Sequence, residues 1–198
     1  MFISFEGVDG SGKTTQVALL ADSLRGEGRN VVATREPGGT PAGERIRELL
    51  LEGGEIAPWT EAALFAAARA QLVDEVIRPA LARGADVICD RYIDSSLAYQ
   101  GIARGLGVER VLELNLLATS GLLPDRTFFL AISPEDTAGR KDAEPDRIER
   151  EGDEFAAIVD QGYRELAAIF AKRVVTIDAT MPASDISREV RGQLRDLA

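Results

Sequence analysis

Short runs of apolar residues alternate along the chain with longer stretches in which apolar residues recur at helical spacing. The short runs predict five buried strands, at residues 1–5, 31–34, 85–90, 127–132 and 174–178. The periodic stretches predict helices that start near residue 15 and then cover 41–52, 60–82, 92–103, 108–119, 155–171 and 184–197. Because strands and helices alternate throughout, we expect an α/β fold with a parallel five-stranded sheet and helices on both faces.

The segment between the fourth and fifth predicted strands differs from the rest of the chain. Residues 134–151 mix basic and acidic side chains, which usually indicates a solvated surface. Gly139 and Pro145 also favour a loop, and basic residues on a loop beside a phosphate site can close over that site. We therefore expect a short mobile lid here, within a single domain that spans residues 1–198.

The first predicted strand runs directly into a glycine-rich loop and then into a helix, as is typical of P-loop NTPases. The loop fits G-x-x-x-x-G-K-[ST], in which backbone N–H groups turn toward phosphate oxygens. Lys13 can then reach the outer phosphates of ATP, and the Thr14 hydroxyl can ligate Mg²⁺; a glycine-rich turn without a ligand is the alternative. The residues expected to bind ATP are Gly7, Val8, Asp9, Gly10, Ser11, Gly12, Lys13 and Thr14.

Two carboxylates accompany this loop. Asp9 lies among groups that should donate to phosphate, so its side chain should point away from the phosphate, toward a hydroxyl or a cation, which hints at a second substrate at the back of the loop. A helix-capping or solvent-facing Asp9 is the alternative. Asp90 closes the third predicted strand, where P-loop proteins place a metal-binding carboxylate, and Arg91 follows it into the same cleft.

Composition and charge narrow the classes of partner and chemistry. The net charge is −10 and the isoelectric point about 4.7, which argues against binding of polymeric nucleic acid. The absence of histidine removes the commonest general base, and the absence of a Cys/His cluster argues against zinc. Cys89 is the only cysteine, and no membrane span or signal peptide is evident, so we expect a cytoplasmic location without membrane contact.

Further polar residues lie where a second ligand could bind. Arg35 and Glu36 end the second predicted strand, at the edge where open parallel sheets bind ligands. Either Arg45 or Arg47, on the next predicted helix, can point into that cleft, although a surface arginine is the alternative for each.

Side chains four residues apart on two predicted helices suggest a pocket for a planar base. Phe65 and Arg69 share one helix face and could stack on and hydrogen-bond such a base. Core packing of Phe65, with the Arg69 head group reaching solvent, is the alternative. A polar ridge on a later helix fits a hydrogen-bonded small molecule, and its pairs are Ser95 with Tyr99 and Ser96 with Gln100.

Together these motifs resemble the bacterial thymidylate kinases across essentially the whole chain. The combination is far more specific than the phosphate loop alone. It rests on residues 5–15, 34–40, 65, 69, 90–92, 95–96, 98–101, 146–149 and 176–178.

The resemblance implies a role for each residue of the pocket. Asp9 takes the 3′-hydroxyl of dTMP, Phe65 stacks on thymine, and Arg69 reaches its O4 edge. Ser96 and Gln100 contact the base, and Tyr99 lies under the sugar, where a 2′-hydroxyl would clash. The residues assigned to dTMP are Asp9, Arg35, Glu36, Arg47, Phe65, Arg69, Arg91, Ser95, Ser96, Tyr99 and Gln100, of which Arg35, Arg47 and Arg91 surround the acceptor phosphate.

The implied reaction transfers the γ-phosphate of ATP to dTMP, giving dTDP and ADP in dTTP biosynthesis, and the implied assembly is a homodimer. Lys13 and Arg91 would be catalytic, and Thr14 and Asp90 would hold Mg²⁺. Because the phosphate loop contains no arginine, Arg140 and Arg147 of the predicted lid are the remaining catalytic candidates. A deoxynucleoside kinase or another monophosphate kinase is the closest alternative, whereas a GTP-binding switch would need an Asn-Lys-x-Asp motif that the chain lacks.

Overall fold

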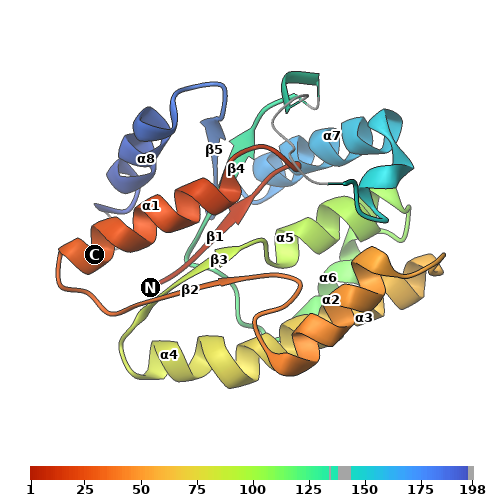
Figure 1. The fold of residues 1–198 in the computed structure, drawn as a ribbon, viewed down its shortest axis with the longest axis horizontal. Coiled ribbons are helices and arrows are strands. Elements are labelled where there is room, and N and C mark those ends of the chain that lie inside the picture. Colours follow the sequence, from red (N-terminus) through yellow and green to blue (C-terminus); the bar gives the residue numbers. More distant parts are fainter. Residues whose placement is uncertain (134, 138–143, 196–198) are drawn as a thin grey trace.

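The computed structural model describes residues 1–133, 135–137 and 144–195. Its centre is a sheet of five parallel strands in the order β2-β3-β1-β4-β5 (Figure 1). The strands are β1 (Phe2–Glu6), β2 (Val31–Arg35), β3 (Asp86–Asp90), β4 (Arg126–Ala131) and β5 (Val174–Asp178). The predicted parallel sheet is confirmed, and each predicted strand lies within one residue of its observed bounds.

The register of the sheet brings the ends of three strands together. Phe5 of β1 pairs with Asp90 of β3, and Asp90 pairs with Arg35 of β2. The phosphate loop leaves β1 at this same edge, immediately after Glu6. Residues far apart in sequence therefore converge at the carboxyl edge of the sheet, where parallel α/β folds bind ligands.

Helices cover both faces of the sheet (Figure 1). Helices α1 and α8 contact each other on one face, and α5 and α7 contact each other on the other. The α-helices are α1 (Lys13–Gly26), α2 (Pro41–Glu52), α3 (Pro58–Leu72), α4 (Arg78–Ala82), α5 (Ile93–Ser96), α6 (Val108–Ala118), α7 (Asp153–Ile169) and α8 (Ala183–Gly192). Wider π-helical turns cover Val73–Ile77 and Leu97–Ala103, and short 3₁₀ turns cover Glu135–Thr137 and Glu149–Glu151.

Two predicted helices are less regular than expected. The predicted helix 60–82 is interrupted by the π turn Val73–Ile77, in which the Arg78 N–H bonds to the Val73 carbonyl. Pro79 follows closely and has no N–H to continue the α-helical pattern. The predicted helix 92–103 is α-helical only in α5 and then widens into the second π turn. None of the helices in the described ranges is long and apolar enough to cross a membrane.

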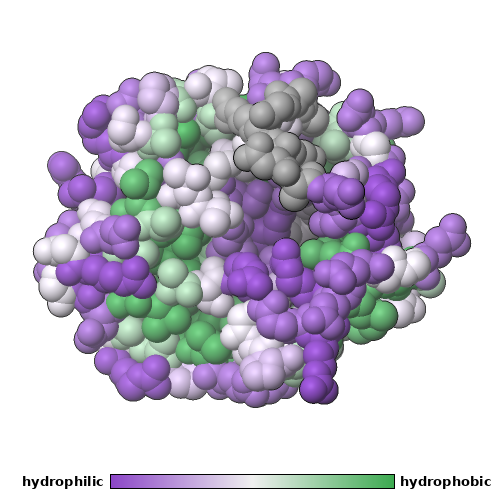
Figure 2. Space-filling model, in the orientation of Figure 1, coloured by the Kyte–Doolittle hydropathy of each residue, from purple (hydrophilic) through white to green (hydrophobic). Residues whose placement is uncertain are grey.

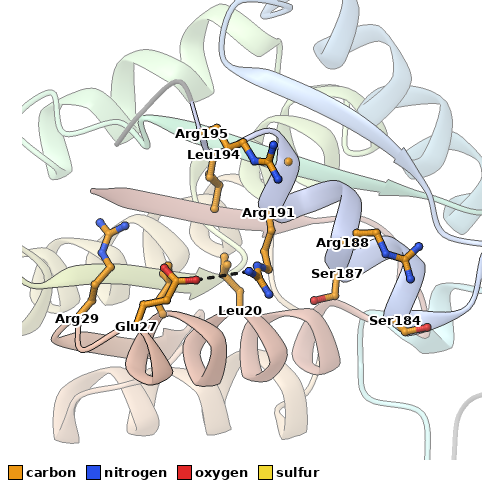
Figure 3. A pocket seen from close by; sticks show the side chains of 11 residues that line it. Leu20, Glu27, Arg29, Ser184, Ser187, Arg188, Arg191, Leu194 and Arg195 are labelled. Carbon is orange, nitrogen blue, oxygen red and sulfur yellow. Dashed lines mark ion pairs between the residues drawn. The ribbon is translucent and has the colours of Figure 1, made fainter.

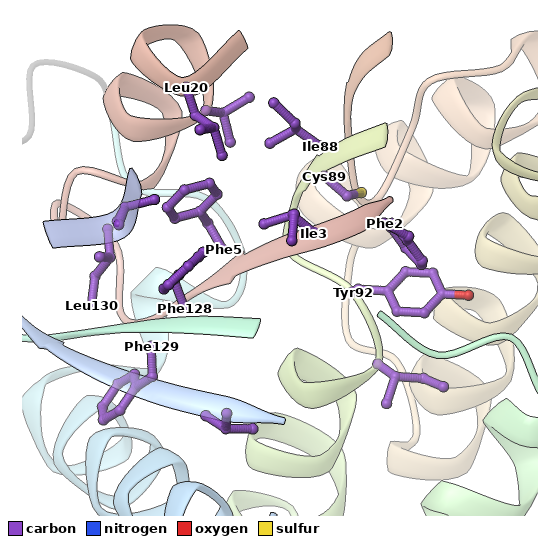
Figure 4. Packing of buried hydrophobic residues seen from close by; sticks show 14 of the residues in the cluster. Phe2, Ile3, Phe5, Leu20, Ile88, Cys89, Tyr92, Phe128, Phe129 and Leu130 are labelled. Atoms are coloured by element: carbon purple, nitrogen blue, oxygen red, sulfur yellow. The ribbon is translucent and has the colours of Figure 1, made fainter. Parts of the chain in front are cut away.

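The hydrophobic core holds the phosphate loop and α7 in place from both faces of the sheet (Figure 4). Phe5 and Phe128, from neighbouring strands, lie with their ring centroids 5.4 Å apart beneath Leu20 of α1. On the other face, Phe129 stacks on Tyr163 of α7 at 5.3 Å. This stacking anchors the Tyr163 ring in the core and leaves its hydroxyl at the carboxyl edge of β1.

Candidate active site

The phosphate loop adopts a conformation that depends on its glycines. Gly7, Gly10 and Gly12 all have positive φ angles, of 142°, 82° and 94°. A Cβ atom at Gly7 would lie 2.8 Å from the Leu130 carbonyl oxygen, so a side chain there would clash with β4. The loop can therefore follow a tight path between β1 and α1 that larger residues would prevent.

Lys13 lies under this loop. Its ammonium group donates to the carbonyls of Gly7 and Val8 at 3.0 and 2.9 Å. Burial, and then the positive charge of Arg91, lower the pKa of Lys13 to about 8. An anionic phosphate beside Lys13 would stabilise its protonated, positively charged form. The site therefore favours binding of a polyanion.

Thr14 and Asp90 provide two oxygen ligands of the kind that Mg²⁺ prefers. The Thr14 hydroxyl donates to Asp90 Oδ2 at 2.6 Å, although 76 positions separate the residues. Mg²⁺ sites in kinases use few protein oxygens and take the rest from phosphates and water. The described residues contain no cluster of three or more acidic, Cys or His side chains that could hold a metal ion.

Asp9 points toward two cations of the chain itself, and the second substrate that the sequence suggested beside it stays a prediction. Its carboxylate lies 2.6 Å from the Arg91 guanidinium and 3.8 Å from the Lys13 ammonium. Arg91 itself has a φ angle of 69°, a left-handed conformation that few non-glycine residues adopt. This backbone turns the Arg91 side chain back over the phosphate loop.

The Arg91 guanidinium is held by groups from several elements. One nitrogen lies 3.2 Å from both the Ser95 and the Tyr163 hydroxyls. The guanidinium carbon also lies 5.4 Å from the centroid of the Tyr99 ring. Arg91 is therefore a positioned cation at the centre of the cleft.

Arg35, Glu36 and Arg47 surround the same edge. Arg35 pairs with Glu44 at 2.9 Å, and Arg47 donates to the Pro37 carbonyl at 3.0 Å. Glu36 is buried, which raises its pKa to about 6 despite the nearby Arg69 guanidinium. Within the described part of the chain, Glu36 Oε1 has no hydrogen-bond partner, so it can accept a bond from a ligand.

Arg69 is buried rather than positioned at a pocket surface. Its guanidinium, 1 % exposed, bonds to Glu36, to the Ser96 hydroxyl, to the Asn115 side chain and to the Tyr92 carbonyl. The alternative in which its head group reaches solvent is therefore wrong. Contact of Arg69 with a base stays a prediction, because the cavity beside Phe65 is lined by Ser96 and not by Arg69.

Two adjoining cavities occupy this edge. The larger, about 670 Å³, runs from the phosphate loop to Ile186 of α8, and the smaller, about 100 Å³, contains Phe65. Figure 2 shows that the molecule is hollowed near the centre of this face, with hydrophilic residues around the hollow. Of the predicted residues, the smaller cavity brings together Asp9, Glu36, Arg47, Phe65, Arg91, Ser95, Ser96, Tyr99 and Gln100, whereas Arg35 lines only the larger one. Both cavities share Asp9, Glu36, Arg47 and Arg91, so two ligands could meet there.

Comparison with known proteins identifies the family of this chain. The sequence model described as Thymidylate kinase matches residues 5–190. The chain belongs to the thymidylate kinase family. Its relatives include thymidylate kinases of Thermoanaerobacter sp. (strain X514), 47 % identical over 96 % of this chain and 94 % of the relative, and of Bifidobacterium longum (strain NCC 2705), 48 % identical over 100 % and 98 %. A crystal structure of thymidylate kinase from Ehrlichia chaffeensis superposes with a TM-score of 0.80 at 34 % identity, and the match covers 98 % of both chains.

Arg147, one of the two predicted lid arginines of this thymidylate kinase chain, does not lie at the phosphate loop. Arg147 bonds to Glu61 at 2.6 Å and to the Leu50 carbonyl at 2.7 Å, and it lines neither of the two adjoining cavities. In this arrangement the buried Glu61 carboxylate holds the Arg147 guanidinium away from the phosphate loop. Its expected role in bridging the phosphates stays a prediction. Arg140 lies outside the described residues, as does part of the predicted lid.

Sequence reasoning missed three residues that organise the thymidylate kinase site: Glu6, Glu61 and Tyr163. Burial, and then repulsion by Asp94, raise the pKa of Glu6 to about 7. A carboxylate at the end of an apolar strand was a visible signal for Glu6. Glu61 lies in the alanine-rich helix α3 and Tyr163 in the amphipathic helix α7, and no local pattern indicated either residue.

A separate hollow lies between α1 and α8 (Figure 3). It measures about 460 Å³ and shares no residue with the thymidylate kinase cleft. Arginines surround it, but Arg191 pairs with Glu27 at 3.5 Å and Arg188 pairs with Asp185 at 3.0 Å. Its charge is thus largely compensated by neighbouring carboxylates.

Proposed function

We propose that this cleft transfers the γ-phosphate of ATP to dTMP, giving ADP and dTDP, the reaction of the thymidylate kinase family. The product dTDP is the precursor of dTTP, so the reaction belongs to dTTP biosynthesis. The observation that carries the proposal is the meeting of the two cavities at Asp9, Glu36, Arg47 and Arg91. A donor phosphate in one cavity and an acceptor phosphate in the other would then be adjacent.

In this proposal the phosphate-loop cavity binds ATP. Backbone N–H groups of the loop and the Lys13 ammonium would bind the phosphates, which replace the loop carbonyls as partners of Lys13. Thr14 and Asp90 would hold Mg²⁺. When bound, Mg²⁺ neutralises phosphate charge and orients the β- and γ-phosphate oxygens.

The smaller cavity would bind dTMP. Phe65 stacks on thymine, Ser96 and Gln100 contact its polar edge, and Arg69 supports that contact from behind Ser96. Tyr99 disfavours ribose, and Asp9 accepts a hydrogen bond from the 3′-hydroxyl. Arg35, Arg47 and Arg91 surround the acceptor phosphate, and Ser95 supports Arg91.

The chemistry requires little proton transfer. The acceptor phosphate oxygen is already anionic, so no general base is needed, which suits a chain without histidine. The main obstacle is repulsion between two polyanions. At ~4 Å each unlike charge pair contributes on the order of 4 kcal/mol at an effective dielectric constant of about 20, so Lys13 and Arg91 can offset a large part of it.

The remaining parts of the proposal rest on the family resemblance. Arg140 and Arg147 stay the candidates for the lid arginine, and Arg147 would have to leave Glu61 to reach a phosphate. A closed lid would exclude water and so suppress ATP hydrolysis. The homodimer and the cytoplasmic location also stay predictions.

The proposed function is tested by offering purified protein, ATP and Mg²⁺ a panel of nucleosides and nucleoside monophosphates. We expect dTMP to be the best acceptor by kcat/KM, with dTDP as the product. Rapid phosphorylation of thymidine, or of another monophosphate in preference to dTMP, would instead support the deoxynucleoside kinase or the alternative monophosphate kinase.

A further inference from the structure

Glu61 is a buried carboxylate beside the proposed base pocket, and nothing in the reaction requires it. It lies in the first turn of α3 and is 1 % exposed. Its oxygens accept hydrogen bonds from Gln100 Nε2 at 2.9 Å, Arg147 Nη2 at 2.6 Å and Arg104 Nη2 at 3.2 Å. Burial alone would raise the pKa of Glu61, but these bonds outweigh burial and lower it, so the carboxylate is ionised.

An ionised carboxylate limits the orientation of its amide neighbour. It can only accept hydrogen bonds, so the Gln100 amide must turn its NH₂ group toward Glu61. Gln100 Oε1 is then the acceptor that the amide can offer to a ligand. Because Gln100 also lines the cavity beside Phe65, that cavity receives a hydrogen-bond acceptor from this position.

Ser96, one helical turn before Gln100, offers the cavity a hydrogen-bond donor instead of an acceptor. Its hydroxyl oxygen accepts a bond from Arg69 Nη1 at 3.0 Å. Since Arg69 can only donate, the Ser96 hydroxyl proton is free to point toward the cavity. The two side chains therefore offer an acceptor and a donor to the same ligand edge.

This pair matches one kind of pyrimidine. Thymine and uracil have an N3–H donor flanked by carbonyl acceptors, whereas cytosine has an N3 acceptor beside an amino donor. We propose that Glu61 is a positioning residue for base selection, which holds the Gln100 amide so that the pocket accepts imide bases and rejects cytosine. The inference rests on the proposed function, because it requires dTMP to occupy the cavity beside Phe65.

The test replaces the carboxylate with a group that can donate as well as accept. In Glu61→Gln, the Gln100 amide is free to turn over, so cytosine gains a donor and thymine loses its acceptor. We expect the ratio of kcat/KM for dTMP to that for dCMP to fall by about tenfold or more, since one well-placed hydrogen bond is worth about that factor. The ratio of dTMP to dUMP should change by less than about twofold, because both bases present the same imide edge.

A matched variant separates selection from packing. Arg104→Gln removes another partner of Glu61 but leaves the bond to Gln100, so we expect the dTMP to dCMP ratio to stay within about twofold of wild type. Should Glu61→Gln fail to fold, the double variant Glu61→Gln/Arg104→Gln replaces both members of an ion pair. We expect its dTMP to dCMP ratio to fall as predicted for Glu61→Gln. Where dCMP turnover is too slow to measure, the affinities of dTMP, dUMP and dCMP, determined by calorimetry, give the same ratios.

The wild-type protein gives an independent readout. At saturating dTMP, the N3 imino proton should give a proton NMR resonance, because Gln100 Oε1 protects it from exchange with water. Absence of that resonance from the wild-type complex, or a folded Glu61→Gln protein with an unchanged dTMP to dCMP ratio, would overturn the role of Glu61. A wild-type protein that neither binds nor phosphorylates dTMP would instead refute the proposed function itself.

Discussion

Arg91 has the least favourable backbone of the residues that line the cleft. Its φ of 69° is compensated by several contacts, since its guanidinium bonds to Asp9, Ser95 and Tyr163. Strained backbones persist where surrounding contacts enforce them, and they cluster at functional sites. The contacts place a permanent positive charge between the two cavities.

We expect Arg91→Ala to lower kcat by at least about a hundredfold, because it removes charge stabilisation of the transferred phosphate. ATP affinity, measured by calorimetry, should change little, since the phosphate loop and Lys13 remain. Arg83→Ala, at an exposed position after α4, is the control and should keep wild-type kinetics. Unchanged steady-state kinetics in Arg91→Ala would remove this residue from the mechanism.

Residues with local signals were the ones that the sequence could predict. Thr14 and Asp90 were expected at one metal site from motif spacing, and they lie in hydrogen-bond contact. The surroundings of Arg69 were harder to predict, because helical spacing shows which residues lie on the same helix face but not whether that face is buried. Its surroundings include Glu36 and Asn115, which come from other segments and have no fixed spacing from Arg69.

At the scale of elements, one buried carboxylate joins a strand to two helices. Glu6 of β1 accepts hydrogen bonds from Ser95 of α5 at 2.6 Å and from Tyr163 of α7 at 3.0 Å. The same two hydroxyls contact Arg91. The packing of α5 and α7 on the sheet therefore also sets the position of the Arg91 guanidinium.

This junction predicts a pH dependence of stability. The pKa of Glu6 rises from 4.5 to about 7 on folding, mainly by burial, so the folded chain binds this proton more tightly than the unfolded chain does. The contribution of Glu6 to the free energy of unfolding should fall as pH rises from 4.5 to 7, by on the order of 1 kcal/mol per pH unit. Glu6→Gln should lack this slope in urea titrations at several pH values.

The comparison of wild type with Glu6→Gln isolates this group. Glu36, whose burial raises its pKa to about 6, contributes a slope of the same sign in both proteins. Parallel stability curves for the two proteins between pH 4.5 and 7 would contradict the protonation of Glu6 on folding.

Element boundaries were predicted well where apolar runs were short and bounded by glycine, proline or charge. The strand at residues 174–178 was predicted with its observed bounds. The π turn Leu97–Ala103 was not predicted, because α and π helices have nearly the same pattern of buried positions over one or two turns. Contacts with α6, the next helix along the chain, and with α7, which is remote in sequence, accompany that wider turn.

At the scale of the whole molecule, the sequence predicted a parallel sheet but not the order of its strands. Order depends on which strands pair, and β1 lies between β3 and β4, both more than eighty residues away. That order brings the ends of β1, β2 and β3 together, so the two cavities adjoin at Asp9 and Arg91. The central claim is that one cleft holds both nucleotides with their phosphates adjacent.

That claim is tested most directly by a single molecule in which adenosine and thymidine are joined through a polyphosphate bridge. We expect it to compete with both ATP and dTMP in steady-state kinetics, and to bind more tightly than either nucleotide because both cavities are filled at once. Competition with only one of the two substrates, at an affinity no better than that substrate alone, would contradict it.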